Sequence, residues 1–235
     1  HLGPSPNYLT MDLSMRALLD KMDRLGIESG ISAHMRSLDD EFEAGILPDK
    51  KGHEASGGRI FSFFCFGPKH PQAALDVMRR YRPDPIFRGI KIHPCGANVD
   101  ADSELYRPVW EAARELKLPI LSHTWSISTY NPSQKNAFAG KFEKYVSEYP
   151  DVTFAFAHSG GRYDGIQEAV RIGKQHQNCY FDIAGDILGN GVLDYLVDNL
   201  GAGRIIYGSD CYMIEQRPML GVVLGANLPA ADKEK

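Results

Sequence analysis

The feature that most constrains the fold of this chain is a regular alternation of short β-branched or aromatic runs with longer amphipathic runs. Ahead of the first short run, Leu18, Met22 and Leu25 recur at three- and four-residue spacing, which indicates a helix with one apolar face. Strand, helix and strand in this order predict parallel strands joined by right-handed helical crossovers. The short runs are predicted as strands: Ile27–His34, Arg59–Phe66, Phe87–His93, Leu118–His123, Val152–His158, Cys179–Ala184 and Arg204–Asp210.

The amphipathic runs are predicted as helices: Met11–Leu25, Gln72–Tyr81, Ala101–Lys117, Lys141–Tyr149, Ile166–Lys174 and Val192–Leu200. The seven predicted strands could form an open doubly wound sheet, whereas a closed barrel needs eight. The chain opens on His1, a Gly3-Pro4 turn and a helical run, which is the order that follows a strand. We therefore predict an α/β chain with a distorted (β/α)8 TIM-type barrel, in a single domain over residues 1–235. Its first strand would be truncated at His1, and an open sheet is the alternative.

Net charge, hydropathy and cysteine spacing indicate which kinds of molecule this chain binds. The net charge of -4 comes without a basic stripe, so no nucleic-acid partner is expected. No apolar run approaches the roughly 20 residues of a membrane span and no signal peptide is visible, so we expect no membrane partner and a cytoplasmic location. The four cysteines lie far apart and form no CxxC pair, which argues against a disulfide scaffold or a zinc ribbon. A small-molecule substrate is the expected partner, and a homo-oligomer stays open.

Four of the predicted strands end in a potential metal ligand or base: Lys91 with His93, then His123, His158 and Asp210. The carboxyl ends of parallel strands form one rim in both barrels and doubly wound sheets, so these side chains are expected to converge. A single histidine at a strand end is usually structural. Three histidines and an aspartate at four strand ends instead indicate a functional site. Cys95 and Cys211 lie just beyond this rim, and we expect them to line the pocket rather than to bind metal.

Strand parity predicts which side chains face inward. In GIKIHP, Lys91 and His93 share the face opposite the isoleucines, and the helix-covered outside of a barrel takes apolar residues. Lys91 and His93 are therefore expected inside. By the same argument we expect His158 to share the barrel interior with Phe154 and Phe156.

A catalytic zinc site has three protein ligands of the His, Asp or Glu type and keeps one position open for water. Bound water then loses a proton near neutral pH, and a carboxylate such as Asp210 can accept that proton. The strand-end residues therefore predict one divalent metal ion. Zinc is the metal we favour, and manganese, iron and cobalt also suit these ligands.

The motifs FRGIKIHP, LPILSHT, VTFAFAHSGG and RIIYGSD occur in an order that resembles the amidohydrolase superfamily, and most closely its amidohydrolase-related (amidohydrolase 2) branch. The likeness covers His1 to about Asp210. It implies a distorted (β/α)8 barrel with one or two divalent metals. Members of this branch include small-molecule hydrolases, lactonases and non-oxidative decarboxylases.

The resemblance also implies roles for individual residues. His123 matches the metal ligand after strand 5, and His158 matches the strand-6 residue that binds metal or polarises the substrate. Asp210 matches the strand-8 ligand and proton acceptor, and His1 would be the second member of the His-x-His pair after strand 1. A strand-4 lysine at the position of Lys91 is carboxylated in two-metal members. We favour a one-metal site in which Lys91 or its neighbour His93 contacts the substrate.

The expected function is metal-dependent hydrolysis of a small amide, ester or lactone by a metal-activated water. His1, His123, His158 and Asp210 would hold the metal, with Asp210 and His158 catalytic. Substrate contacts are assigned to a separate set: Lys91, His93, Arg162 and Trp125. One alternative is a metal-dependent non-oxidative decarboxylase of a small aromatic or unsaturated acid. Another is a degenerate barrel that binds a ligand without turnover.

Overall fold

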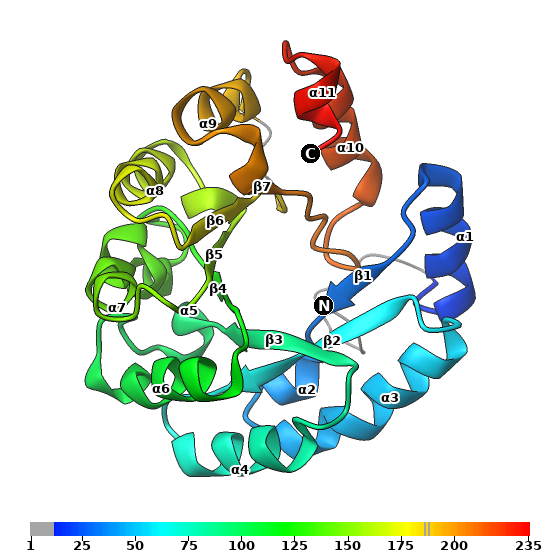
Figure 1. Cartoon of the computed structure of the whole chain (residues 1–235), viewed down its shortest axis with the longest axis vertical. Helices are drawn as coiled ribbons and strands as arrows, with labels where there is room; N and C mark the ends of the chain where they lie inside the picture. The colour runs from blue at the N-terminus through cyan, green and yellow to red at the C-terminus, as the bar shows by residue number, and fades with distance from the viewer. Residues whose placement is uncertain (1–11, 186, 188) are drawn as a thin grey trace.

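The computed structural model describes residues 12–185, 187 and 189–235, and they form one curled parallel sheet inside a ring of helices (Figure 1). The seven strands of this sheet follow one another in chain order. Each predicted run contains one strand, so the prediction of a distorted (β/α)8-type barrel is confirmed. The strands are β1 (Gly30–Ser32), β2 (Ile60–Phe66), β3 (Phe87–Ile92), β4 (Ile120–His123), β5 (Phe154–Ala157), β6 (Cys179–Asp182) and β7 (Ile205–Ile206).

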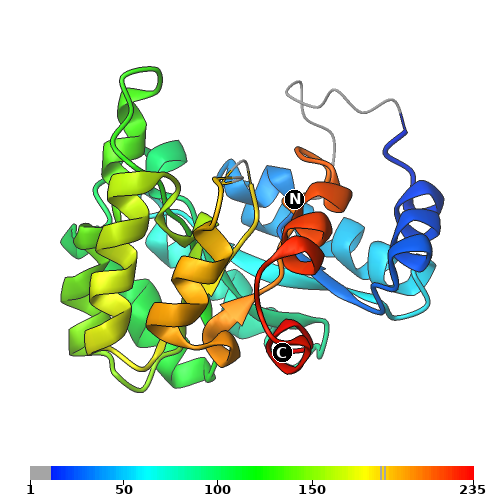
Figure 2. The same cartoon turned by 90° about the horizontal axis from the view of Figure 1, so that it is seen from above.

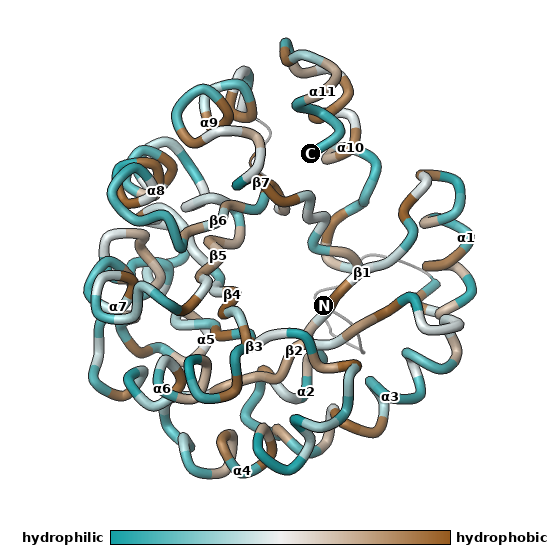
Figure 3. The backbone as a smooth tube through the Cα atoms, viewed as in Figure 1, coloured by the Kyte–Doolittle hydropathy of each residue, from teal (hydrophilic) through white to brown (hydrophobic). Residues whose placement is uncertain are grey.

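The α-helices lie outside the sheet: α1 (Met15–Leu25), α2 (Met35–Leu38), α3 (Ile46–Ala55), α4 (Pro71–Tyr81), α5 (Pro94–Ala97), α6 (Arg107–Leu116), α7 (Glu143–Glu148), α8 (Tyr163–Gln175), α9 (Val192–Leu200), α10 (Gln216–Gly225) and α11 (Ala230–Lys233). Short 3-10 turns connect them: η1 (Phe42–Gly45), η2 (Glu104–Tyr106), η3 (Pro132–Ala137), η4 (Ala139–Phe142), η5 (His158–Gly160) and η6 (Ala202–Arg204). In Figure 3, hydrophilic positions gather mostly on the outer side of this ring. None of the helices in the described part of the chain is long and apolar enough to cross a membrane.

Some helices differ from the sequence prediction. The predicted helix Ala101–Lys117 is interrupted, because Ser103 caps the short turn η2 before α6 begins at Arg107. The helices α3 and α10 were not predicted at all. Each contains a proline and an internal glycine, and both residue types weaken a helical pattern.

The core between sheet and helices is aromatic, and it corrects one parity prediction. Phe154 and Phe156 were expected inside the barrel, but both are fully buried on the outer face of β5. Their rings lie 5.1 and 5.9 Å from that of Phe142, beneath the helix layer. The inward positions of β5 are Ala155 and Ala157, which line the central cavity. The prediction was wrong because the helix layer, not the interior, takes the large rings here.

The sheet has its two edges at β1 and β7, and the described residues include no ladder between these strands. The helices α10 and α11 lie outside this opening, between α9 and α1 (Figure 2). Side chains bridge the opening on the outside. Lys21 Nζ of α1 lies 3.1 Å from Glu215 Oε2, and the Tyr212 hydroxyl donates to the Ser14 carbonyl at 3.1 Å. The predicted strand that ends at His1 lies outside the described residues.

Candidate metal centre

Three histidines meet at the carboxyl ends of adjacent strands. His93 follows β3, His123 ends β4 and His158 follows β5. The rings of His93 and His123 stack with their centroids 4.4 Å apart, and the ring of His158 lies edge-on to His123 at 4.9 Å. The convergence predicted from the strand ends is therefore present for all three imidazoles.

Hydrogen bonds set which nitrogen of each imidazole carries its proton. His123 Nε2 lies 2.8 Å from the amide oxygen of Gln134, and His158 Nδ1 lies 2.9 Å from the carbonyl oxygen of Ala184. An oxygen acceptor requires an N–H on the ring nitrogen that faces it, so the other nitrogen of each neutral ring keeps a free lone pair. Metal-binding histidines are held in this way, with one nitrogen donating to an oxygen and the other facing the ion.

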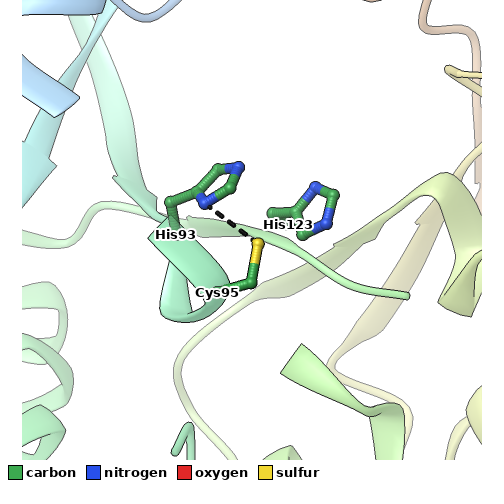
Figure 4. A group of neighbouring side chains, drawn as sticks. All are labelled: His93, Cys95 and His123. Atoms are coloured by element: carbon green, nitrogen blue, oxygen red, sulfur yellow. Dashed lines mark hydrogen bonds between the residues drawn. The ribbon is translucent and has the colours of Figure 1, made fainter. Parts of the chain in front are cut away.

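His93 has the opposite arrangement. Its Nδ1 accepts the backbone N–H of Gly96 at 3.0 Å and lies 3.4 Å from Cys95 Sγ (Figure 4). Because Nδ1 is an acceptor, the proton of the neutral ring sits on Nε2. Burial, with a smaller contribution from the charge of Lys91, lowers the pKa of His93 to about 3, so the ring is neutral at physiological pH. His93 thus offers a hydrogen-bond donor beside the two available lone pairs.

Cys95 lies closer to the centre than the sequence indicated. One potential ligand atom from each of His93, Cys95 and His123 lies within 4.8 Å of the other two. Burial raises the pKa of Cys95 to about 11, so the side chain is a thiol at neutral pH. The other cysteine expected at the rim, Cys211, lines the central cavity.

His158 reaches the centre through an unusual backbone turn. The backbone φ angles of His158 and Ser159 are 63° and 48°, in the left-handed region. The turn continues through Gly160, where a Cβ atom would collide with the carbonyl oxygen of Gly165. The direction of His158 is therefore set by this turn and not by the alternation of β5.

Asp182, at the end of β6, holds this turn in place and was missed by the sequence analysis. Its Oδ1 accepts the backbone N–H groups of His158 at 2.8 Å and Ala184 at 2.9 Å, and its carbonyl accepts the Ser159 hydroxyl at 2.7 Å. The available signal was a single charged residue inside the otherwise apolar run CYFDIA, at the position where β6 ends. Gln134 was also missed, because it follows β4 by a long loop and no motif marks it.

The charged side chains predicted at the rim line a central cavity of about 680 Å³, together with Asp182. Lys91, His158 and Asp210 all face this cavity. Burial lowers the pKa of Lys91, while the carboxylates of Asp182 and Asp210 act in the opposite direction. Asp210 lies beyond the end of β7, which is shorter than predicted, and its backbone is left-handed with φ 55°.

Two predicted substrate contacts, Trp125 and Arg162, lie at the side of the imidazole cluster. The Trp125 ring is nearly parallel to that of His123, with a centroid distance of 6.1 Å, and lies 5.4 Å from His158. The Arg162 guanidinium lies over the indole at 6.0 Å. The remaining predicted ligand, His1, lies outside the described residues.

This donor set fits a divalent metal. Two imidazoles have hydrogen-bonded orientations that leave a lone pair free, as metal-binding histidines do. The Cys95 sulfur lies within 4.8 Å of a ring nitrogen of His123, and Asp182 and Asp210 line the cavity that His158 also faces. Nothing in these ligand types selects zinc over manganese, iron or cobalt.

A family model described as Amidohydrolase matches residues 7–235. No curated protein matches the chain in sequence. Among solved structures, 5-carboxyvanillate decarboxylase from Sphingomonas paucimobilis has a TM-score of 0.69 at 15% identity, covering 96% of this chain and 80% of its own. For 2,6-dihydroxybenzoate decarboxylase from Rhizobium the TM-score is 0.72 at 16% identity, with 96% and 85% covered.

A third solved structure is 5-carboxyvanillate decarboxylase from Novosphingobium aromaticivorans, complexed with manganese and 4-hydroxy-3-methoxy-5-nitrobenzoic acid. Its TM-score is 0.71 at 16% identity, and the match covers 99% of this chain and 81% of that one. At these identities the likenesses show a shared fold.

Proposed function

This chain belongs to the amidohydrolase family, and on that premise we propose that it is a divalent-metal enzyme that releases carbon dioxide from a small hydroxylated aromatic acid. The observation that carries the proposal is that the three imidazoles differ in which ring nitrogen carries the proton. His123 and His158 each keep a lone pair on the ring nitrogen that makes no hydrogen bond, whereas His93 keeps its N–H on Nε2. Such a site can hold a cation and an oxygen-rich anion side by side.

His123 Nδ1 and His158 Nε2 would hold the metal. Asp210, which lines the central cavity together with His158, would add a carboxylate ligand. When bound, the ion would supply positive charge that draws electrons from the substrate's carboxylate and the neighbouring hydroxyl oxygen. The His93 ring, with its Nε2–H, and Lys91 Nζ would donate hydrogen bonds to the same oxygens. Trp125, whose ring flanks His123 and His158, would form an apolar side of the substrate site.

In the proposed reaction the bond between the ring carbon and the carboxylate carbon breaks. Carbon dioxide leaves, and the electron pair of that bond remains on the ring carbon. The Asp210 carboxylate relays a proton from solvent to this carbon and ends the reaction ionised, as it began. The overall change replaces a carboxylate by hydrogen, so no oxidant or reductant is required.

The comparisons support this reaction over the hydrolysis expected from the sequence, because the three solved structures described above are decarboxylases of hydroxylated aromatic acids. One of them contains manganese, which makes manganese the first metal to test. Hydrolysis of an amide, ester or lactone uses the same residues and is the competing reading.

Product analysis separates the two. The protein, loaded with Mn²⁺, is incubated with 2,6-dihydroxybenzoate or 5-carboxyvanillate in D₂O, and in parallel with a panel of aryl esters and lactones. We expect carbon dioxide and one deuterium on the ring carbon, with loss of activity in chelator. Net water addition to an ester or lactone without carbon dioxide release would replace the proposal by hydrolysis. Absence of both reactions, with bound ligand, would favour a binding protein.

A further inference from the structure

Gln134 makes the hydrogen bond that orients His123, although it lies eleven residues further along the chain. Gln134 lies in the 3-10 turn η3, and its amide oxygen is 2.8 Å from His123 Nε2. This contact leaves Nδ1 as the only ring nitrogen of His123 with a free lone pair. The loop after β4 therefore decides which atom of His123 can face a metal.

The turn that carries Gln134 is anchored independently of that contact. The Trp125 N–H donates to the Ala137 carbonyl at 3.1 Å, which ties η3 back to the end of β4. Asn136 Nδ2 donates to Asn98 Oδ1 at 3.0 Å, and the Ala101 N–H donates to the Asn136 carbonyl at 2.9 Å. Asn136 and Ala137 are 5% and 0% exposed. Because these contacts hold η3, we expect a change of the Gln134 side chain to leave the turn in place.

We propose that Gln134 is a positioning residue that holds His123 as the Nε2–H tautomer and so directs Nδ1 toward the metal. The inference rests on the proposed function only in that it assumes a metal at His123. Without the glutamine oxygen, either nitrogen of the neutral ring can carry the proton, and the ring can turn toward His93, its stacking partner at 4.4 Å. Partners of this kind change metal affinity by roughly 10- to 100-fold.

The test compares three variants. Gln134→Leu removes the acceptor at similar size, and Gln134→Glu keeps an oxygen acceptor. Lys135→Leu, at an exposed position on the same turn, is the matched control. The dissociation constant for Mn²⁺ is measured by calorimetry, and the tautomer of His123 is measured in metal-free protein by ¹⁵N NMR of the ring nitrogens. Thermal unfolding of each variant checks that the fold is retained.

We expect Gln134→Leu to weaken Mn²⁺ binding by about 10- to 100-fold and to abolish the single Nε2–H signal of His123. Gln134→Glu should bind Mn²⁺ at least as tightly as the parent, and Lys135→Leu should match the parent in both measurements. A Gln134→Leu protein that keeps the parental tautomer, or one that keeps the parental affinity, overturns the inference.

The two proposals fail separately. If Mn²⁺ binding depends on Gln134 but no carbon dioxide is released, the positioning role stands and the proposed reaction is wrong. If carbon dioxide is released equally well by Gln134→Leu with an unchanged tautomer, the reaction stands and the positioning role is wrong. A parent protein that binds no Mn²⁺ overturns the metal-directing role whatever the tautomer.

Discussion

The two sides of the barrel are built differently. From β2 to β6, aromatic residues fill the space between sheet and helices, and Trp110, Phe154 and Phe156 are fully buried. At the opening between β7 and β1 the strands span only two and three residues. There, Ile31 and Ile206 are 42% and 41% exposed.

The candidate centre takes residues from both the packed side and the opening. Its imidazoles project from the packed side, where each is held by a hydrogen bond, whereas Asp210 follows the short strand β7. We infer that the packed core holds the imidazoles in their orientations. Asp210 takes part in the reaction but contributes little to the free energy of unfolding.

The largest expected effect comes from the packed side. Trp110 stacks on Phe154 at 5.2 Å and on Tyr145 at 5.6 Å, so Trp110→Ala should lower the free energy of unfolding by about 3–5 kcal/mol. Ile206→Ala on β7 is the matched change at the opening, and it should cost less than about 1 kcal/mol because the residue is already partly exposed. Urea unfolding measures both. Equal losses in the free energy of unfolding for the two variants would show that the two sides do not differ in packing.

Asp210→Asn should lower turnover by about 10³-fold, because the amide cannot deliver a proton. Asparagine tolerates a left-handed backbone, so the free energy of unfolding should change by less than about 0.5 kcal/mol. Steady-state kinetics and urea unfolding of the same preparation give both numbers. Retained turnover would remove the catalytic role assigned to Asp210, and a large loss of stability would contradict its separation from the core.

Helix α3 packs on β2, next to the opening, and carries a buried carboxyl group. Burial raises the pKa of Asp49 to about 7, although a hydrogen bond with Ser62 acts in the opposite direction. The folded state therefore binds this proton more tightly than the unfolded chain does. The free energy of unfolding should fall as pH rises from about 4 to 7, with a loss of about 2–3 kcal/mol between pH 5 and pH 8.

Asp49→Asn is the control for this pH dependence, since it removes the titrating group and keeps the shape. Urea unfolding at pH 5 and pH 8 should then show a difference between parent and variant that grows with pH. The same slope in both proteins would show that other groups are responsible.

The smallest of these effects should come from Asp182, which supports the His158 turn at the rim of the packed side. Asp182→Ala leaves the buried N–H groups of His158 and Ala184 without their acceptor and should cost about 2 kcal/mol. Asp182→Asn keeps an oxygen in place and should cost less. An alanine variant as stable as the parent would show that the left-handed turn at His158 needs no support from β6.

The sequence predicted the order of strands and helices well, because each strand is a short β-branched or aromatic run between amphipathic helices. It also predicted that His93, His123 and His158 converge, since parallel strands end at one rim. It misplaced Phe154 and Phe156, because alternation gives two faces without saying which one the helices cover. His158 reached the centre by a turn that alternation does not describe.

Gln134 and Asp182 show what a single sequence leaves out. Neither residue belongs to a motif, and each acts through a contact with a distant part of the chain, on His123 and His158 respectively. Such contacts depend on the path of a loop and on strand register. Those features emerge only when the whole barrel is assembled.

The left-handed turn after β5 limits how this centre could be transplanted. A protein engineer who grafted only the histidines onto another barrel would aim the third imidazole along the strand's own alternation and miss the other two. The transferable unit is the whole segment His158–Gly161 together with Gly165, because a side chain at Gly160 would collide with the Gly165 carbonyl. A mutagenesis library aimed at new substrates should therefore hold these glycines constant and vary positions such as Trp125.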